Sequence, residues 1–281
     1  MKHTFKAQKE YQKLTEFISE ELAFLPISTI RSQMRQGEVR INGKVAEKEQ
    51  PVQKDDEVKI FLPERFEPKT VMPEIVYADQ NIAVVRKPVL CETETHLTNL
   101  MRTVYPMCVP AHRLDRNTGG LVIFSLNEMA EKEILCLFKD RKIEKYYRAE
   151  VYGTVKPSAQ TVTLYLKKDA ELGRVSVSDT QKAGYLSATL SYTTILQCGG
   201  NTVLDICLHT GRTHQIRAVM AHLGYPVIGD GKYGSEKINR IQKVKYQRLL
   251  AYKICFSAMS GSGILNYLSG TKIELKNIDL I

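Results

Sequence analysis

Hydrophobic positions recur at helical spacing in the first forty residues. One predicted helix is ended by Pro26 and carries its apolar side chains on a single face: Leu14, Phe17, Ile18, Leu22 and Leu25. Ser28 can cap a second short helix with Ile30 and Met34 inward, and Gly37 supplies the left-handed residue that ends it. The pattern therefore predicts two short helices at the start of the chain.

The hydrophobic period changes to two after this helix pair. Apolar and charged residues alternate over 39–41, Asn42-Gly43 is a type I′ hairpin signal, and a later strand is predicted at 58–61. The order helix, helix, hairpin, strand makes residues 1–63 a small α/β domain.

Residues 74–281 are predicted to form a larger domain. The segment 64–73 before it has prolines and charges but no apolar period, which is typical of a linker. Strand-like runs occur at 82–85, 121–124, 147–152 and 203–208, and helical ones at 127–139 and 213–223. Because strands outnumber helices and do not alternate regularly with them, we predict an α+β fold with a mixed, largely antiparallel sheet.

The composition is that of a soluble globular protein. The 281 residues are 43% hydrophobic and 25% charged, with a net charge of +9, which excludes a disordered tail and a membrane protein. No stretch approaches the roughly 18 apolar residues of a membrane span, and the N-terminus lacks a signal peptide, so we expect a cytoplasmic protein. The six cysteines are dispersed without a C-x-x-C pair, and we expect reduced thiols and no metal.

Cations are unevenly placed in the small domain, although residues 1–63 hold eleven Lys and Arg against ten Asp and Glu. Arg31 and Arg35 lie one turn apart on the second predicted helix, and Arg40 and Lys44 flank the hairpin. These four residues form either one basic stripe for a polyanion or a solvated face.

Asp115 lies between Arg113 and Arg116 in a turn that Gly119 and Gly120 make flexible, directly before a predicted strand. A neighbouring arginine favours the ionised carboxylate, which can act as a nucleophile or base. The alternative is an ordinary surface ion pair.

Two further stretches carry candidate chemistry. Thr213 can cap the 213–223 helix, which would place Arg212 and His214 where an anion is welcome, and Arg217 can reach a nearby carboxylate. The histidines fit no common zinc spacing. In the strand at 147–152, Tyr147 either stacks on a nucleobase or fills the core.

These stretches together resemble the RluA-type family of pseudouridine synthases over roughly residues 74–256. The resemblance rests on four ordered strings: Lys87-Pro88, His112-Arg113-Leu114-Asp115-Arg116-Asn117-Thr118-Gly119-Gly120, Lys145-x-Tyr147-x-Ala149, and Gly211-Arg212-Thr213-His214-Gln215-Ile216-Arg217 followed by Gly229-Asp230. The segment 89–96 departs from the family's pattern. The run 14–62 resembles the small RNA-binding domain named after ribosomal protein S-four, which implies that the basic stripe contacts structured RNA.

The resemblance implies that the chain isomerises uridine in structured RNA to pseudouridine without a cofactor. Asp115 would attack the ribose or abstract its proton, Tyr147 would stack under the uracil and assist loss of the carbon 5 proton, and Arg217 would pair with Asp115. RNA phosphates would contact Arg113, Arg116, Arg212 and His214. We expect rRNA rather than tRNA as substrate, and a monomer. The alternatives are a non-catalytic protein that binds structured RNA and a phosphodiester-cleaving enzyme.

Overall fold

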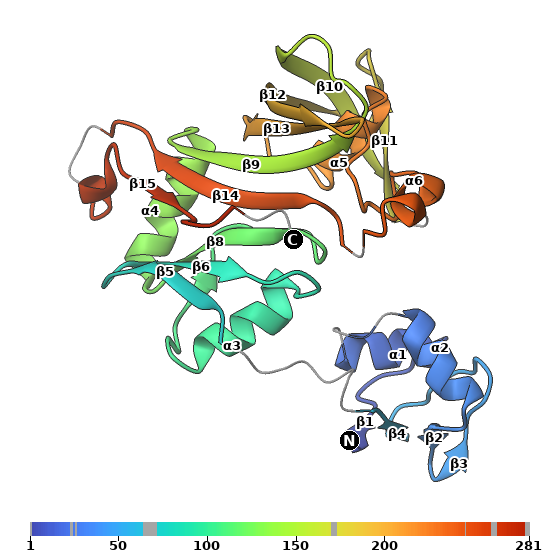
Figure 1. Cartoon of the computed structure of the whole chain (residues 1–281). Coiled ribbons are helices and arrows are strands. Elements are labelled where there is room, and N and C mark those ends of the chain that lie inside the picture. The colour runs from blue at the N-terminus through green and yellow to red at the C-terminus, as the bar shows by residue number, and fades with distance from the viewer. Residues whose placement is uncertain are drawn as a thin grey trace. The chain divides into compact units, whose positions relative to one another are not determined.

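The computed structural model describes residues 2–22, 25, 27–63, 72–169, 173–244, 246–259 and 263–278. Two compact units are formed, Met1–Met72 and Pro73–Ile281, and each is described by itself (Figure 1). Pro26 and positions 64–71, which make up most of the predicted linker, lie outside the described residues.

The first unit combines two helices with a four-stranded antiparallel sheet in the order β1-β4-β2-β3. Its elements are β1 Lys2–Lys6, α1 Leu14–Glu21, α2 Ile27–Arg35, β2 Val39–Ile41, β3 Lys44–Val45 and β4 Glu57–Phe61. The helices pack with the sheet around one apolar core, which includes Phe17, Ile30 and Ile60. Asn42 and Gly43 both have positive φ, 49° and 81°, as a type I′ turn requires.

Two boundaries in this unit differ from the sequence-based expectation. Helix α1 ends at Glu21 because the backbone of Leu22 leaves the helical region, so Leu25 is buried outside the helix. Helix α2 begins at Ile27, one residue before Ser28, and Ser28 therefore is not its cap. The hydrophobic pattern did not predict strand β1, because its residues are mostly polar and lie at an exposed edge of the sheet.

The second unit is built on an eleven-stranded sheet in the order β11-β10-β12-β13-β9-β14-β8-β6-β5, with β15 paired to β14 and β7 to β8. Its strands are β5 Glu74–Ala78, β6 Ile82–Lys87, β7 Val109–Pro110, β8 Gly119–Ser125, β9 Ile143–Tyr152, β10 Ala159–Asp169, β11 Arg174–Ser178, β12 Leu186–Cys198, β13 Asn201–Leu208, β14 Leu249–Phe256 and β15 Lys272–Glu274. Its helices are η2 Thr93–Leu97, α3 Thr98–Arg102, α4 Glu128–Lys139, α5 Gln215–His222, α6 Glu236–Ile241 and η3 Asn266–Leu268.

The pairing of β14 with β8 is parallel, and every other strand pair of this sheet is antiparallel in the described part of the chain. The prediction of an α+β fold with a mixed, largely antiparallel sheet is confirmed. Strand β10 was not predicted, because only every second residue is apolar there and no continuous run marks it.

Two apolar cores lie on the two faces of the large sheet. Ala130 and Ile134 of α4 belong to a core with Ile123 of β8, whereas Ile216 of α5 belongs to a second core with Val122 of the same strand. Residues on the α5 side include Tyr147, Ala149 and Val151, the three that alternation places on one face of β9. Tyr147 is thereby fixed beside α5. No helix among the described residues is long and apolar enough to cross a membrane.

Candidate active site

Asp115 lies in the turn between β7 and β8, and this turn is fixed by close backbone contacts. Gly120 has φ +120°, and a Cβ there would lie 2.1 Å from the Ala251 carbonyl oxygen on β14, so only glycine fits. The buried Lys87 ammonium donates hydrogen bonds to three carbonyl oxygens, those of Cys91 (2.7 Å), Pro88 (3.1 Å) and Arg116 (3.3 Å). Burial lowers the pKa of Lys87 to about 8. Lys87 thus ties the end of β6 to the Asp115 turn.

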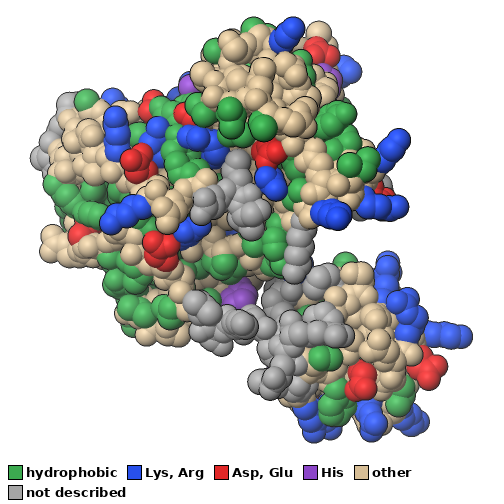
Figure 2. Space-filling model, viewed as in Figure 1, with side chains coloured by type: hydrophobic (Ala, Val, Ile, Leu, Met, Phe, Trp, Pro, Cys, Tyr) green, Lys and Arg blue, Asp and Glu red, His purple; other side chains and the backbone are tan. Residues whose placement is uncertain are grey.

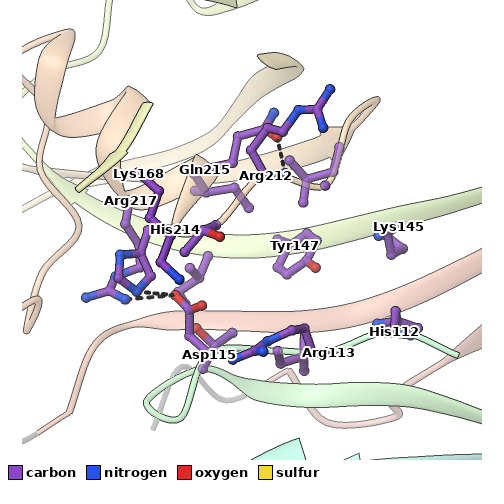
Figure 3. A pocket seen from close by; sticks show the side chains of 17 residues that line it. His112, Arg113, Asp115, Lys145, Tyr147, Lys168, Arg212, His214, Gln215 and Arg217 are labelled. Atoms are coloured by element: carbon purple, nitrogen blue, oxygen red, sulfur yellow. Dashed lines mark hydrogen bonds and ion pairs between the residues drawn. The ribbon is translucent and has the colours of Figure 1, made fainter. Parts of the chain in front are cut away.

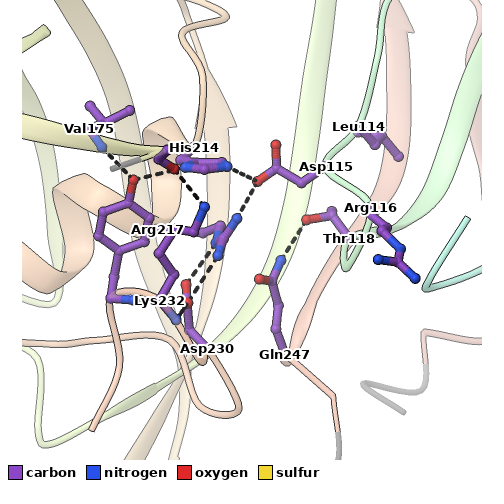
Figure 4. A network of polar contacts seen from close by, with 12 residues as sticks. Leu114, Asp115, Arg116, Thr118, Val175, His214, Arg217, Asp230, Lys232 and Gln247 are labelled. Atoms are coloured by element: carbon purple, nitrogen blue, oxygen red, sulfur yellow. Dashed lines mark hydrogen bonds and ion pairs between the residues drawn. The ribbon is translucent and has the colours of Figure 1, made fainter. Parts of the chain in front are cut away.

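Arg217 of α5 connects this turn to a buried carboxylate (Figure 4). Its Nη1 donates to Asp115 Oδ2 at 2.7 Å, and its Nε and Nη2 donate to the two carboxylate oxygens of Asp230 at 2.7 and 3.0 Å. The Asp230 side chain is fully buried and also accepts the backbone N–H groups of Lys232 and Tyr233. The planar guanidinium is therefore clamped on one edge and presents the other edge to Asp115.

The charges in this cluster stabilise one another. Burial alone would lower the pKa of Arg217, but hydrogen bonds and charges from Asp230 and Asp115 raise it above its usual value. Burial would likewise raise the pKa of Asp230, yet its hydrogen bonds and charge interaction with Arg217 hold that pKa below the usual range. The Asp115 side chain itself remains about a quarter exposed, which leaves one side of the carboxylate open.

The partner of Asp115 differs from the one that its neighbours in sequence suggest. Arg113 points to Glu94, with 2.7 Å between Nη1 and Oε2, and the Nε of Arg116 lies 3.5 Å from the Leu90 carbonyl oxygen. The expectation that Arg113 or Arg116 holds Asp115 is wrong, because the Arg113 guanidinium pairs with Glu94 and Figure 4 shows the Arg116 side chain directed away from the Asp115 carboxylate. The ion pair at hydrogen-bond distance comes from Arg217, which is distant in sequence and is the partner that the family resemblance implied.

A central cavity of about 380 Å³ lies between β9, the Asp115 turn and the start of α5 (Figure 3). It is lined by the candidate residues Asp115, Tyr147, Arg217, Arg113, Arg212 and His214, together with His112, Lys145 and Lys168. Figure 3 shows Tyr147 between two ends of the cavity, with Asp115 and Arg217 at one end and Lys145 and His112 at the other. Arg116 does not line the cavity.

Tyr147 shows only 6% of its surface, and its hydroxyl forms no hydrogen bond within the described part of the chain. Burial, and then the negative charge of Asp115, raise the pKa of Tyr147. The neutral phenol is therefore the resident form at neutral pH, with one face available inside the cavity.

His214 is the residue directly before α5 and has a left-handed backbone conformation, φ 52°. Its side chain forms no capping hydrogen bond to the helix. The expectation that Thr213 caps it is wrong, because the turn continues one residue further before helical geometry starts. His214 Nδ1 lies 2.8 Å from the Tyr233 hydroxyl, and Nε2 lies 3.9 Å from Asp115 Oδ2. Burial lowers the pKa of His214. Arg212 is exposed and donates its Nε to the Ser187 carbonyl oxygen at 3.1 Å.

Comparison with known proteins agrees with this geometry. Residues 75–222 match the family described as RNA pseudouridylate synthase, which is more than half of the chain. The chain belongs to the RNA pseudouridylate synthase family. It is an isomerase of the RluA type.

Relatives of this synthase match about four fifths of its chain. It is 30% identical to an uncharacterised RNA pseudouridine synthase of Aquifex aeolicus, over 82% of this chain and 79% of that protein. It is 27% identical to the ribosomal large subunit pseudouridine synthase C of Vibrio vulnificus, over 81% and 78%. The solved structure of human RNA pseudouridylate synthase domain containing 1 has the same fold, with a TM-score of 0.59 and 22% identity over 76% of this chain and 94% of that one.

Two supporting residues of the synthase escaped the sequence reasoning. Asp230 was noticed only as part of the Gly229-Asp230 string, and no role could be given to it before its contact with Arg217 was known. Gln247 is buried and donates to the Thr118 hydroxyl in the Asp115 turn at 2.6 Å. No motif or period marks Gln247, so only the fold reveals it.

Proposed function

We propose that this synthase isomerises uridine to pseudouridine in structured cytoplasmic RNA, with Asp115 as the catalytic carboxylate. The observation that supports this is the Asp115 carboxylate in the central cavity, held by Arg217 at 2.7 Å and close enough to Tyr147 for its charge to raise the tyrosine pKa. A positioned carboxylate that is still partly open is what a nucleophilic step requires.

The reaction breaks the bond between uracil N1 and the ribose C1′ and forms a bond between C5 and the same C1′. Asp115 supplies electrons to the ribose, either by attack on C1′ or by removal of the C2′ proton. The detached uracil turns, and C5 bonds to C1′ as the bond from C1′ to Asp115 breaks or, in the other route, as Asp115 returns the proton to C2′. The C5 proton is then lost while N1 regains one. Atoms and charge balance without a cofactor, so the chain's own side chains suffice.

Tyr147 is proposed to stack under the uracil while it is detached. Its burial places the ring against the α5-side core, and its neutral phenol keeps a second negative charge away from Asp115. If Asp115 becomes bonded to the ribose, its charge no longer opposes the phenolate. The phenol proton can then pass to uracil N1, and the resulting tyrosine oxygen accepts the C5 proton, so the phenol is neutral again at the end of the step.

RNA contacts are proposed in both units. Arg113 and Arg212 line the central cavity and Arg116 flanks it, so these three can bind phosphates around a uridine that has left its helix. In the small unit Arg31, Arg35, Arg40 and Lys44 are exposed, and they form no ion pair among the described residues. Figure 2 shows Lys and Arg side chains projecting over α2 and the β2–β3 end of this unit. We propose that residues 1–63 are an S-four-like RNA anchor.

Ribosomal RNA is the proposed substrate. The relative from Vibrio vulnificus, which matches 81% of this chain, is named for the large ribosomal subunit. A combined anchor and catalytic unit suits a large structured RNA better than a short loop.

The test is conversion of uridine-labelled bulk RNA, separated into rRNA and tRNA fractions. We expect pseudouridine in the rRNA fraction with no shortening of the chains. Binding without conversion would favour the non-catalytic alternative, shortened RNA would favour phosphodiester cleavage, and label converted only in tRNA would overturn the choice of substrate.

A further inference from the structure

A second cavity of about 430 Å³ adjoins the central one and is not used by the proposed mechanism. The side cavity, as we call it, lies between the segment 138–145, which joins α4 to β9, and the loop 208–211 after β13. The two cavities share His112, Lys145, Leu208 and Gly211 in their linings. A nucleotide chain that enters the central cavity therefore has a continuous wall to follow into the side cavity.

Lys145 is the charged group on this shared wall. Its ammonium forms no hydrogen bond and no ion pair with any described residue. It lies over the Phe138 ring, with 5.1 Å between Nζ and the ring centroid. Burial alone lowers the pKa of Lys145, with no carboxylate to oppose that effect. Lys87 is buried and its ammonium donates to three carbonyl oxygens, whereas Lys145 is half-buried and its ammonium has no acceptor among the described residues. No anionic partner for Lys145 is present among the described residues, and its ammonium lines two cavities in which a ligand could supply one.

The other titratable groups around the side cavity leave this positive charge uncompensated. Lys139 and Arg141 are exposed on its rim, whereas Glu144 accepts a hydrogen bond from the Tyr146 hydroxyl at 3.1 Å. His112 is neutral, because burial and the charge of Lys145 lower its pKa to about 3. His209 is held by Ser191, 2.7 Å from Nε2 to Oγ. Three cations and one engaged carboxylate leave a net positive charge at the side cavity, which suits an anionic ligand.

We propose that the side cavity binds the RNA nucleotide adjacent to the target uridine, with its phosphodiester held by Lys145. A phosphodiester carries one negative charge and offers two acceptor oxygens, which complements one unpartnered ammonium. Lys145 lies at the end of the central cavity opposite to Asp115, so this contact would anchor the strand without touching the reacting ribose (Figure 3). The inference rests on RNA as the substrate of this family and not on the assignment of Asp115.

The first experiment compares RNA affinity and its salt dependence for Lys145→Met, Lys145→Arg and the parent. Lys145→Met keeps the length of the side chain and removes its charge. We expect the affinity for the substrate RNA, identified by the conversion assay, to weaken about tenfold, and the slope of log affinity against log salt to become shallower by about one. Lys145→Arg should retain the slope. The matched control is Lys237→Met, an exposed lysine of α6 that lines neither cavity.

An unchanged affinity and slope for Lys145→Met, or a change equal to that of Lys237→Met, would overturn the proposal. Affinity is measured instead of turnover, so an error in the role of Asp115 leaves this readout intact. Should Lys145→Met not fold, Lys145→Gln provides a second neutral variant.

The second experiment identifies the phosphate. Each linkage that flanks the target uridine is replaced in turn by a neutral methylphosphonate, and the affinity of each RNA is measured with the parent and with Lys145→Met. We expect one linkage next to the uridine whose neutralisation weakens parent binding about tenfold but does not weaken the variant further. Additive losses at every linkage would contradict the proposal. Inorganic phosphate is also added at constant ionic strength. If it weakens RNA binding by the parent but not by Lys145→Met, the cavity is a site for free phosphate instead.

Discussion

Two buried cations of the large unit differ sharply from the four cations of the basic stripe in the small unit. In the large unit Arg217 has 5% of its surface exposed and is bound by two carboxylates, and the ammonium of Lys87 is enclosed by three carbonyl oxygens. In the small unit the four cations Arg31, Arg35, Arg40 and Lys44 all face solvent. The Arg40 guanidinium lies over the aromatic ring of Phe61, 5.9 Å from its centroid. Arg217 and Lys87 are fixed by partners within the protein, and the four cations of the basic stripe form no ion pair among the described residues.

This difference separates positioning from contact. A buried cation with several partners holds other groups in one geometry, because removing any partner leaves an uncompensated charge. An exposed cation contributes little to the free energy of folding. Its main energetic contribution comes when a polyanion binds and counterions are released. We therefore expect substitutions in the large unit to affect turnover and folding, and substitutions in the small unit to affect affinity and its salt dependence.

The largest expected effect is that of Asp115→Asn. The amide keeps the size of the side chain and most of its hydrogen-bonding capacity but lacks the negative charge, so turnover should fall by at least about a thousandfold. RNA affinity should change little. Pseudouridine formation is measured under single-turnover conditions, with Asp179→Asn, an exposed partner of His222, as the matched control. Activity within about tenfold of the parent would show that Asp115 is not the catalytic carboxylate.

Arg217→Ala should impair both folding and turnover. The fully buried Asp230 would lose its partner, and the free energy of unfolding should fall by about 3–5 kcal/mol. Asp115 would lose the contact that aims it, and turnover should fall by about a hundredfold. Arg217→Lys keeps the charge but cannot bridge both carboxylates, so it should be intermediate.

Urea unfolding and turnover are measured for both Arg217 variants. The control is Arg240→Ala, because Arg240 forms an exposed helical ion pair with Glu236 that should contribute less than about 0.5 kcal/mol. Wild-type turnover by Arg217→Ala at every pH would contradict the positioning role.

His112 tests the burial of the large unit through its acid stability. Its Nε2 accepts the Ile123 N–H at 3.2 Å, and burial followed by the charge of Lys145 lowers its pKa from 6.5 to about 3. Because the folded-state pKa is depressed, the contribution of the neutral ring is complete above pH 6.5 and is lost as the pH falls toward 3. This loss is on the order of 1.4 kcal/mol per pH unit within that window.

The variant His112→Gln retains an acceptor for the Ile123 N–H but does not titrate there. We expect its free energy of unfolding to decrease less steeply than that of the parent between pH 6.5 and 4, as measured by urea unfolding at several pH values. Parallel pH profiles for the two proteins would mean that His112 is protonated in the folded state.

The sequence predicted which segments carry the chemistry better than it predicted how they meet. The alternation that placed Tyr147, Ala149 and Val151 on one face needed only local periodicity, and the Asn42-Gly43 turn needed only local backbone preferences. The clamp of Arg217 by Asp230 depends on how α5 packs against distant strands, and the contact of Gln247 with Thr118 joins positions 129 residues apart. Such contacts have no local signal. The direction taken by Arg113 likewise depends on Glu94 in a segment whose pattern was unfamiliar.

The smallest expected effect belongs to the small unit, where the four cations of the basic stripe, Arg31, Arg35, Arg40 and Lys44, are replaced together by Gln in the full-length chain. Their side chains are exposed and make no ion pair among the described residues, so melting temperature should remain close to that of the parent. Turnover at saturating RNA should also remain, because none of them lies in the central cavity.

Affinity for the converted RNA should weaken instead, and most at low salt. If the stripe neutralises about three or four phosphates, the slope of log affinity against log salt becomes shallower by a similar number, and parent and variant converge as salt rises. The matched control replaces Lys2, Lys13, Lys48 and Lys54, four exposed lysines of the same unit outside α2 and the β2–β3 hairpin, and removes the same charge. Equal slopes for the two variants would mean that net charge alone acts and that the stripe is a solvated face. If the steep salt dependence of affinity is lost only when the stripe is replaced, the four cations of the stripe are the RNA anchor. The bound cations of the large unit, Arg217 and Lys87, then hold the catalytic geometry.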